Sequence, residues 1–351
     1  MKSLIWKFKK ININRQIDQK IRKIIFKRDR AFEKECKDYF AKIGFKLSNF
    51  MYSSIYYYYT QNRDVRYISE YLYYTFIEPK LNKKLLNVAY TDKGSYQQFI
   101  QADKLIKNLI KSVNGVIYKD DSVCINQEIK ENGVVFKPSI ESGGGLGIKF
   151  AFNKEEYDEF WRLFKKKYDN FVVQPIVKQN LFFSQFNETS LNTIRCLVYK
   201  SPISNRCIVI NSVLRVGKKD SRVDNQAAGG RVIGIKDGVL GKFSIDKYGN
   251  KSNYINDIDL ASNNFKINKW EEIESSAEVS VKNFPHAMIF GVDLCVLNDE
   301  SVKVIEVNCF NNEINFYQMT NGPLFGDYTE EILRMANNRK TGYVLWGECE
   351  N

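Results

Sequence analysis

Two apolar, β-branched runs separated by a short polar break constrain this fold more than any other stretch. Residues 289–308 read IFGVDLCVLNDESVKVIEVN. Such a pattern is typical of a β-hairpin, in which the facing residues are symmetric about the turn. If the turn is centred in the middle of NDES, Asp293 faces Glu306, and Asn308 lies on the same face as Glu306.

The acidic pair on this hairpin allows two interpretations. Like charges that face each other across a sheet are destabilising, so an acidic pair on an apolar ribbon needs a compensating cation. One interpretation is a solvated face where acidic residues have no special role. The alternative is a divalent metal site with oxygen ligands, suited to Mg²⁺ carried on a nucleotide phosphate. The apolar character of both strands favours the metal site.

Composition indicates an ordinary globular protein. The 351 residues are 44% hydrophobic and 27% charged, and no run of 18 uncharged apolar residues occurs, so we expect no transmembrane helix. The start, MKSLIWKFKK, lacks the apolar core and cleavage site of a secretory signal. The seven cysteines are scattered without a C-x-x-C pair, which favours reduced thiols and a cytoplasmic location.

The histidine content restricts the chemistry. The sequence contains one histidine, His286, and a catalytic triad or a zinc site would have to be built around it. A lone histidine is more often structural. The remaining candidates are Lys, Arg, Asp, Glu and backbone groups, a set that fits phosphate handling, where positioning and electrostatics do most of the work.

Positive charge is concentrated at the start of the chain. Residues 1–30 contain eleven Lys or Arg against Asp18 and Asp29, so they carry +9 of the net charge of +12. Apolar residues recur there near helical spacing and predict an amphipathic basic helix: Ile17, Ile21, Ile24, Ile25 and Phe32. This helix either packs on the body of the protein or lies on an anionic membrane surface. No nucleic-acid-binding motif follows, and we expect no nucleic-acid partner.

Helical patterns continue beyond this segment. Residues 31–86 contain a dense tyrosine run, and tyrosines at this density can pack a helical layer or line a sugar site; we favour packing. Residues 93–113 also have helical spacing. Elsewhere the patterns predict a small hairpin over 115–125, helices at 154–168, 271–283 and 329–336, and strands at 171–176, 232–235 and 239–243.

A glycine-rich loop lies between two predicted strands. Residues 134–138 form a strand that contains Lys137, and a second strand follows at 148–152. Glycines let backbone N–H groups approach phosphate oxygens. The loop matches neither a Walker A motif nor G-x-G-x-x-G, and hairpin tips also collect glycine. Lys137 and the acidic hairpin downstream favour phosphate binding by the loop residues Ser142, Gly143, Gly144 and Gly145.

Two arginines interrupt another predicted hairpin. Residues 191–200 and 206–216 form its apolar strands, with Arg195 in the first and Arg215 in the second. A buried arginine is costly unless it is paired, so a phosphate or a carboxylate is the expected partner, and pairing with a core acid is the alternative. The loop at 217–231 is polar and has a length that indicates function or disorder.

The order of these residues resembles the ATP-grasp superfamily. More narrowly, it is similar to the sugar-transfer-associated ATP-grasp proteins and their α-L-glutamate-ligase-like relatives. The resemblance covers roughly residues 90–335. The closer match is carried by LNTIR at 191–195, RVG at 215–217, VDN at 223–225, GG at 229–230 and EVN at 306–308.

The resemblance implies an α+β chain with an ATP-grasp fold, in which two α/β subdomains grip ATP beside a basic, mainly helical N-terminal segment. Four stretches are expected on this basis. They are a basic, tyrosine-rich helical region at 1–88, an N-terminal subdomain with the glycine loop at 89–170, a C-terminal subdomain with the metal site at 171–340, and a tail at 341–351.

The same resemblance implies how the nucleotide would be held. Lys93 and Lys137 would bind its phosphates, and the glycine loop would close over them. Gln174 and Ile176 would border the adenine. Gln174 stands where many ATP-grasp enzymes carry a glutamate, so its contact with the nucleotide differs from the family pattern.

The resemblance also implies roles near the transferring phosphoryl group. Mg²⁺, or Mn²⁺ in its place, would be bound by Asp293, Glu306 and Asn308. Arg195 and Arg215 would neutralise the phosphoryl group and an acyl phosphate. Asn225 would lie near the acceptor.

Three functions remain open at this point. The first is an ATP-dependent ligase that activates a carboxylate as an acyl phosphate for attack by an amine, in surface-polysaccharide or sugar-conjugate synthesis. Its partners would be small-molecule or sugar-linked carboxylates and amines. The second is an ATP-grasp phosphotransferase acting on a hydroxyl. The third is a non-catalytic module that binds a nucleotide or a membrane, and residues 1–30 suggest peripheral attachment at the inner face of a membrane.

Overall fold

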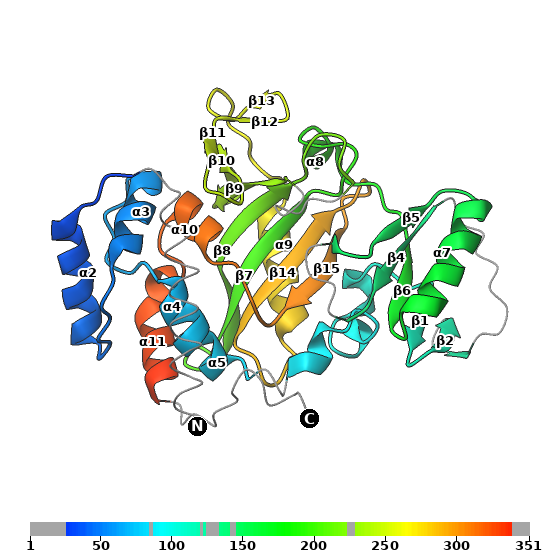
Figure 1. Cartoon of the computed structure of the whole chain (residues 1–351), viewed down its shortest axis with the longest axis horizontal. Coiled ribbons are helices and arrows are strands. Elements are labelled where there is room, and N and C mark those ends of the chain that lie inside the picture. Colours follow the sequence, from blue (N-terminus) through cyan, green and yellow to red (C-terminus); the bar gives the residue numbers. More distant parts are fainter. Residues whose placement is uncertain are drawn as a thin grey trace.

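Two antiparallel sheets and the helices packed on them make up the chain (Figure 1). The structure is a computed structural model that describes residues 26–83, 87–119, 122–123, 133–140, 145–222 and 229–338. The smaller sheet lies on one side of the larger sheet, and the N-terminal helices lie on its other side (Figure 1). The predicted α+β class is confirmed.

The smaller sheet has six strands in the order β3-β2-β1-β6-β4-β5. Helix α7 covers one face, where Phe164 contacts Phe136 and Phe171. The helix begins at its N-cap Asn153, whose side chain accepts from the N–H of Glu156. The bounds are β1 (Ile110–Val113), β2 (Val116–Lys119), β3 (Ser122–Val123), β4 (Val134–Pro138), β5 (Lys149–Ala151), β6 (Phe171–Pro175) and α7 (Lys154–Lys167).

The larger sheet has seven strands in the order β11-β10-β9-β8-β7-β14-β15. All eight residues of β14 are buried, which accounts for its nearly continuous apolar sequence. A separate two-stranded ribbon, β12 (Tyr254–Ile255) and β13 (Ile258–Asp259), lies near one edge. The bounds of the sheet are β7 (Thr193–Ser201), β8 (Arg206–Val216), β9 (Arg231–Lys236), β10 (Val239–Ile245), β11 (Lys251–Ser252), β14 (Ile289–Val296) and β15 (Val302–Asn308).

Different helices pack on the two faces of the larger sheet. Because side chains alternate along a strand, Cys196 and Val198 lie on one face and Leu197 and Tyr199 on the other. The first face packs with α9 (Trp270–Val281) and α8 (Leu181–Ser184). The second face packs with the N-terminal helices and the two C-terminal helices, α10 (Asn315–Asn321) and α11 (Thr329–Asn338).

The N-terminal region is helical, as predicted, and its tyrosines pack the core. Tyr56, Tyr67 and Tyr73 are among its buried residues. Helix α2 begins at Arg30, because Asp29 caps it by accepting from the N–H of Phe32. The predicted basic helix therefore does not run continuously to Phe32, and residues 1–25 lie outside the described residues. The bounds are α2 (Arg30–Lys42), α3 (Met51–Thr60), α4 (Glu70–Leu72), a π-helix η1 (Tyr73–Ile77) and α5 (Glu78–Leu81).

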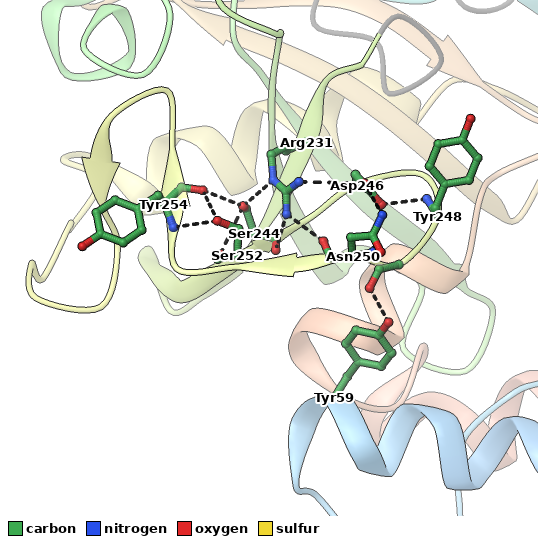
Figure 2. A network of polar contacts seen from close by, with 9 residues as sticks. Tyr59, Arg231, Ser244, Asp246, Tyr248, Asn250, Ser252 and Tyr254 are labelled. Carbon is green, nitrogen blue, oxygen red and sulfur yellow. Dashed lines mark hydrogen bonds and ion pairs between the residues drawn. The ribbon is translucent and has the colours of Figure 1, made fainter. Parts of the chain in front are cut away.

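A polar network joins α3 to the edge of the larger sheet (Figure 2). Arg231 donates to the hydroxyl and the carbonyl of Ser244 and to the carbonyl of Asn250. The turn that contains Asn250 is closed by the Asp246 side chain, which accepts from the N–H of Asn250. Tyr59 of α3 donates to the carbonyl of Gly249 in the same turn. The Tyr59 contact therefore joins α3 to the turn that follows β10.

The predicted helix over residues 93–113 is wrong. This stretch contains two short 3₁₀ turns, η3 (Tyr96–Gln98) and η4 (Ala102–Lys104), followed by strand β1. A turn at Gly94, closed by the side chain of Asp92, interrupts any helix. The apolar residues then pair with β6 rather than line a helix face, so tertiary pairing overrides the helical spacing.

The remaining predicted elements are confirmed within one to three residues at their ends, including the hairpin of β7 and β8 and the helices α7, α9 and α11. Two further 3₁₀ turns are η2 (Val88–Thr91) and η7 (Gly326–Tyr328). Among the described residues, no helix combines the length and the apolar character needed to cross a bilayer.

Candidate functional site

The acidic hairpin forms as predicted, with one irregularity. Strands β14 and β15 pair so that Asp293 faces Glu306 and Gly291 faces Asn308. The register then shifts by one residue, because Leu294 faces Val304 and Ile305 is left as a bulge. The turn is thus centred on Asp299, half a residue earlier than predicted, and the bulge restores the predicted pairing at the acids.

Asp293 holds two buried arginines from the neighbouring strands. Its Oδ1 accepts from Arg195 Nε at 2.6 Å, and its Oδ2 accepts from Arg195 Nη2 at 2.6 Å and Arg215 Nη1 at 3.1 Å. Burial alone would raise the pKa of Asp293, but the charges and hydrogen bonds of the two arginines lower it below its ordinary value. Both arginines therefore pair with a buried acid, which was the alternative interpretation, and this acid belongs to the acidic hairpin itself.

Lys93 connects the two sheets. Its Nζ donates to Glu306 Oε1 at 2.8 Å on β15 of the larger sheet. Its backbone N–H donates to the carbonyl of Ser139, directly after β4 of the smaller sheet. Lys93 is 9% exposed. A lysine held at this junction lies beside the start of the glycine-rich loop and beside the acidic hairpin.

Lys137 belongs to the same set of contacts. It lies on the face of the smaller sheet opposite α7, where its Nζ donates to Gln174 Oε1 at 2.9 Å. Gln174 Nε2 donates to Asn108 Oδ1 at 2.9 Å, and Asn108 Nδ2 donates to the carbonyl of Lys93 at 3.3 Å. We call Lys137, Gln174, Asn108, Lys93 and Glu306 the polar chain, because it runs without a break from one sheet to the other.

Asn108 was not predicted from the sequence. It lies in the stretch that was interpreted as a helix, where an isolated asparagine has no evident function. Its position just before β1, which pairs with β6, is what places it beside Gln174. A correct strand assignment for residues 110–113 would have pointed to it.

Part of the predicted site lies outside the described residues. These are Ser142, Gly143, Gly144 and Asn225. The base of the glycine loop is described: β4 and β5 pair as an antiparallel hairpin around it. Gly147 has a φ of +78°, and an added Cβ would meet the Tyr168 hydroxyl at 2.6 Å, so this end of the loop tolerates only glycine. Gly145 also has a positive φ, of +74°.

A family model described as sugar-transfer associated ATP-grasp matches residues 73–332. The chain belongs to this family. The match begins within the π-helix η1, so the ATP-grasp unit includes α5 as well as both sheets.

Three solved structures resemble the chain at low identity. The biotin carboxylase domain of 2-oxoglutarate carboxylase from Hydrogenobacter thermophilus, in complex with MgADP, ADP and bicarbonate, shows 12% identity and a TM-score of 0.42 over 72% of this chain and 46% of that one. D-alanine–D-alanine ligase from Bacillus anthracis shows 12% identity and a TM-score of 0.38 over 71% and 66%. The VanG D-Ala:D-Ser ligase from Enterococcus faecalis shows 16% identity and a TM-score of 0.39, over 70% of this chain and 60% of that one. This chain thus spans about half to two thirds of their lengths. No curated protein matches it.

The two residues expected to border the adenine lie where β6 ends. Gln174 and Ile176 lie at the end of β6, and the N–H of Ile176 donates to the carbonyl of Gly133 at 3.1 Å. Gln174 contacts Lys137 through its side chain, whereas Ile176 lies beside Gly133, directly before β4. Their contact with adenine remains a prediction.

The polar side chains of the acidic hairpin fit a hard divalent cation that is bound together with ATP. Asp293, Glu306 and Asn308 offer only oxygen ligands, which suit Mg²⁺ and Mn²⁺. The described residues contain no cluster of three His, Cys, Asp or Glu, so this set would consist of two carboxylates and an amide. The amide nitrogen of Asn308 is buried and has no hydrogen-bond partner among the described residues. A phosphate oxygen would satisfy it.

Proposed function

We propose that this chain binds ATP with Mg²⁺ between its two sheets and uses it to activate a carboxylate for attack by an amine. The polar chain carries the proposal, because it connects Lys137 of the smaller sheet, Lys93 at the junction and Glu306 of the larger sheet. Lys93 and Lys137 would bind the phosphates. Asp293, Glu306 and Asn308 would hold the metal ion, which would neutralise phosphate charge.

The balance of charge supports phosphate binding. Arg195, Arg215, Lys93 and Lys137 contribute four positive charges, against the two carboxylates of Asp293 and Glu306. The surplus favours a polyanion, and the arginines are already oriented by Asp293 before any substrate arrives. Preorganised cations of this kind stabilise charge that develops during phosphoryl transfer.

The proposed reaction has two steps. A carboxylate oxygen attacks the γ-phosphorus, the bond from that phosphorus to the bridging oxygen breaks, and ADP leaves. The amine nitrogen then attacks the acyl carbon of the acyl phosphate, the bond to the phosphate oxygen breaks, and the nitrogen loses a proton. Arg195 and Arg215 would stabilise the charge on the transferring group in both steps, and no histidine is needed.

The substrates are proposed from the family description alone. Because the family is associated with sugar transfer, we propose that a small-molecule or sugar-linked carboxylate and amine are joined in surface-polysaccharide or sugar-conjugate synthesis. The fold supports the ATP half of the reaction more directly than the acceptor half.

Product analysis tests the proposal. Purified protein is supplied with γ-³²P-labelled ATP, Mg²⁺ and mixtures of carboxylic acids and amines. A ligase releases the label as free phosphate only when both substrates are present. Label on an organic product would instead indicate a phosphotransferase and contradict the ligase proposal. Glu306→Gln should lower turnover by roughly 10²–10³. Turnover close to that of the wild type would contradict the metal assignment.

A further inference from the structure

Asn82, directly after α5, joins the ends of the two strands that carry the acidic hairpin. It is fully buried. Its Nδ2 donates to the carbonyls of Ile289 at 2.5 Å and Cys309 at 2.6 Å. Its Oδ1 accepts from the N–H groups of Met288 at 2.9 Å and Ile289 at 3.1 Å. An amide side chain has two donors and two lone pairs, and all four are used here.

Two other side chains from the same segment hold the turn that follows β15. Tyr74 donates from its hydroxyl to the carbonyl of Asn312 at 2.9 Å, and Glu78 Oε1 accepts from the N–H of Asn312 at 3.4 Å. Tyr74, Glu78 and Asn82 are spaced four residues apart, so they project from one side of the helical segment. We call these three residues the clamp.

The clamp acts where the sheet's own hydrogen bonds stop. Ile289 is the first residue of β14, and Cys309 directly follows Asn308, the last residue of β15. Beyond Asn308 the chain turns toward α10. The turn lies tightly against β14, since a Cβ added to Gly291 would meet Asn312 Oδ1 at 2.2 Å. Gly291 faces Asn308 across the ladder.

We propose that Asn82 is a positioning residue for the metal site. By joining the start of β14 to the carbonyl after Asn308, it fixes the spacing of Asn308 and Glu306 relative to Asp293. This inference rests on the proposed function, because it assumes that these three residues bind Mg²⁺. Mg²⁺ demands near-ideal octahedral geometry, so a small displacement of one strand end lowers its affinity.

The test compares two asparagines that make similar contacts. Asn82→Asp replaces the amide nitrogen, which carries both donors, with a carboxylate oxygen that faces the carbonyls of Ile289 and Cys309. Asn87 is also buried, and its Nδ2 donates to the carbonyls of Lys83 and His286, neither of which lies in β14 or β15. Asn87→Asp therefore makes the same chemical change without touching the acidic hairpin.

The readout is the Mg²⁺ concentration that gives half of the maximal thermal shift at a fixed concentration of a non-hydrolysable ATP analogue. We expect Asn82→Asp to raise it by 10-fold or more, as is typical for loss of a group that orients metal ligands, and Asn87→Asp to change it by less than about twofold. Asn82→Ser keeps one donor and should raise this Mg²⁺ concentration by a smaller factor. If Asn82→Asp does not fold, Asn82→Ser is measured in its place.

The outcomes separate the two proposals. Equal Mg²⁺ requirements in Asn82→Asp and wild type, or equal increases in the Asn82 and Asn87 variants, would overturn the positioning role while leaving the Mg²⁺ site in place. A wild-type protein with no Mg²⁺-dependent shift would overturn the proposed function and, with it, this inference.

Discussion

At the scale of single residues, the buried carboxylate of Asp293 is coupled to the two arginines that donate to it. The carboxylate side chain is 4% exposed, and the arginines are 14% and 13% exposed. Removing one partner from such a group leaves buried charge without compensation, which costs more than the pair contributed. Asp293 is therefore a stability residue as well as a proposed metal ligand.

Asp293→Asn should destabilise the fold by about 3–5 kcal/mol, because Arg195 and Arg215 lose their shared counter-ion. Glu306→Gln should cost less, roughly 1–2 kcal/mol, because the Glu306 side chain is 26% exposed and water can compensate Lys93 for the lost carboxylate. Urea denaturation without nucleotide measures both. Equal losses would contradict the buried-charge account.

A second residue-scale prediction concerns Glu78. Burial raises the pKa of its carboxyl to about 8, and its titratable neighbours Tyr73, Tyr74 and Cys309 are themselves held neutral, since burial raises their pKa values as well. The pKa of Glu78 is higher in the folded state than in the unfolded state. At pH values between these two pKa values, the folded state therefore binds more protons than the unfolded state. Stability should fall as pH rises from about 5 through about 8, by several kcal/mol.

The variant Glu78→Gln isolates this effect. It has no proton to lose, so its melting temperature should depend less steeply on pH between 6 and 8.5 than that of the wild type. Parallel profiles for the two proteins would show that Glu78 does not titrate in this range.

The sequence predicted most of the candidate site at this scale, but not its supporting residues. Asp293, Glu306 and Lys137 stand out because charge in an apolar strand or beside a glycine loop is unusual, whereas Lys93 was assigned only through the resemblance to the ATP-grasp superfamily. Asn82 carries no such signal. Its importance comes from four backbone contacts that are far away in sequence.

At the scale of elements, the two sheets depend on each other through short polar contacts between strands and loops. Strand β1, the element that sequence reasoning missed, brings Asn108 between the lysines. Helical spacing over residues 93–113 could not reveal it, because pairing with β6 is a non-local interaction. The bulge at Ile305 was equally hidden, since a hairpin pattern specifies faces but not a one-residue irregularity.

Asn108→Leu should weaken binding of an ATP analogue by roughly tenfold, equivalent to about 1.4 kcal/mol, because it removes two hydrogen bonds of the polar chain. Isothermal titration calorimetry at saturating Mg²⁺ measures the Kd of the analogue for the variant and the wild type. The Mg²⁺ requirement should stay the same, because Asn108 does not contact the acidic hairpin. Unchanged nucleotide affinity would show that the polar chain does not organise the nucleotide site.

At the scale of the whole molecule, the ATP-grasp unit and the N-terminal helices form one packed body, in which the helices share a hydrophobic core with the larger sheet. The basic residues 1–25 precede the N-cap of α2 and lie outside the described part. They contain eight Lys or Arg and one acid, Asp18. Each such cation near an anionic bilayer contributes about 1 kcal/mol.

Deleting residues 1–25 should abolish sedimentation with phosphatidylglycerol vesicles, which are anionic, because the cations that attract the chain to the surface are gone. The truncation keeps Asp29, so the capped helix α2 and the response to an ATP analogue should be retained. Neutral phosphatidylcholine vesicles serve as the control. Equal sedimentation of the full-length and truncated proteins with anionic vesicles would dispose of the membrane hypothesis.

The central claim is a Mg²⁺-dependent ATP site between the two sheets, and thermal denaturation tests it most directly. Melting temperatures are measured with a non-hydrolysable ATP analogue, with and without Mg²⁺, for the wild type and Glu306→Gln. A ligand at about 100 times its Kd stabilises by roughly 2.7 kcal/mol, which corresponds to several degrees. We expect this shift in the wild type with Mg²⁺ and its loss in the variant. No shift in the wild type, or the same shift in both proteins, would contradict the account.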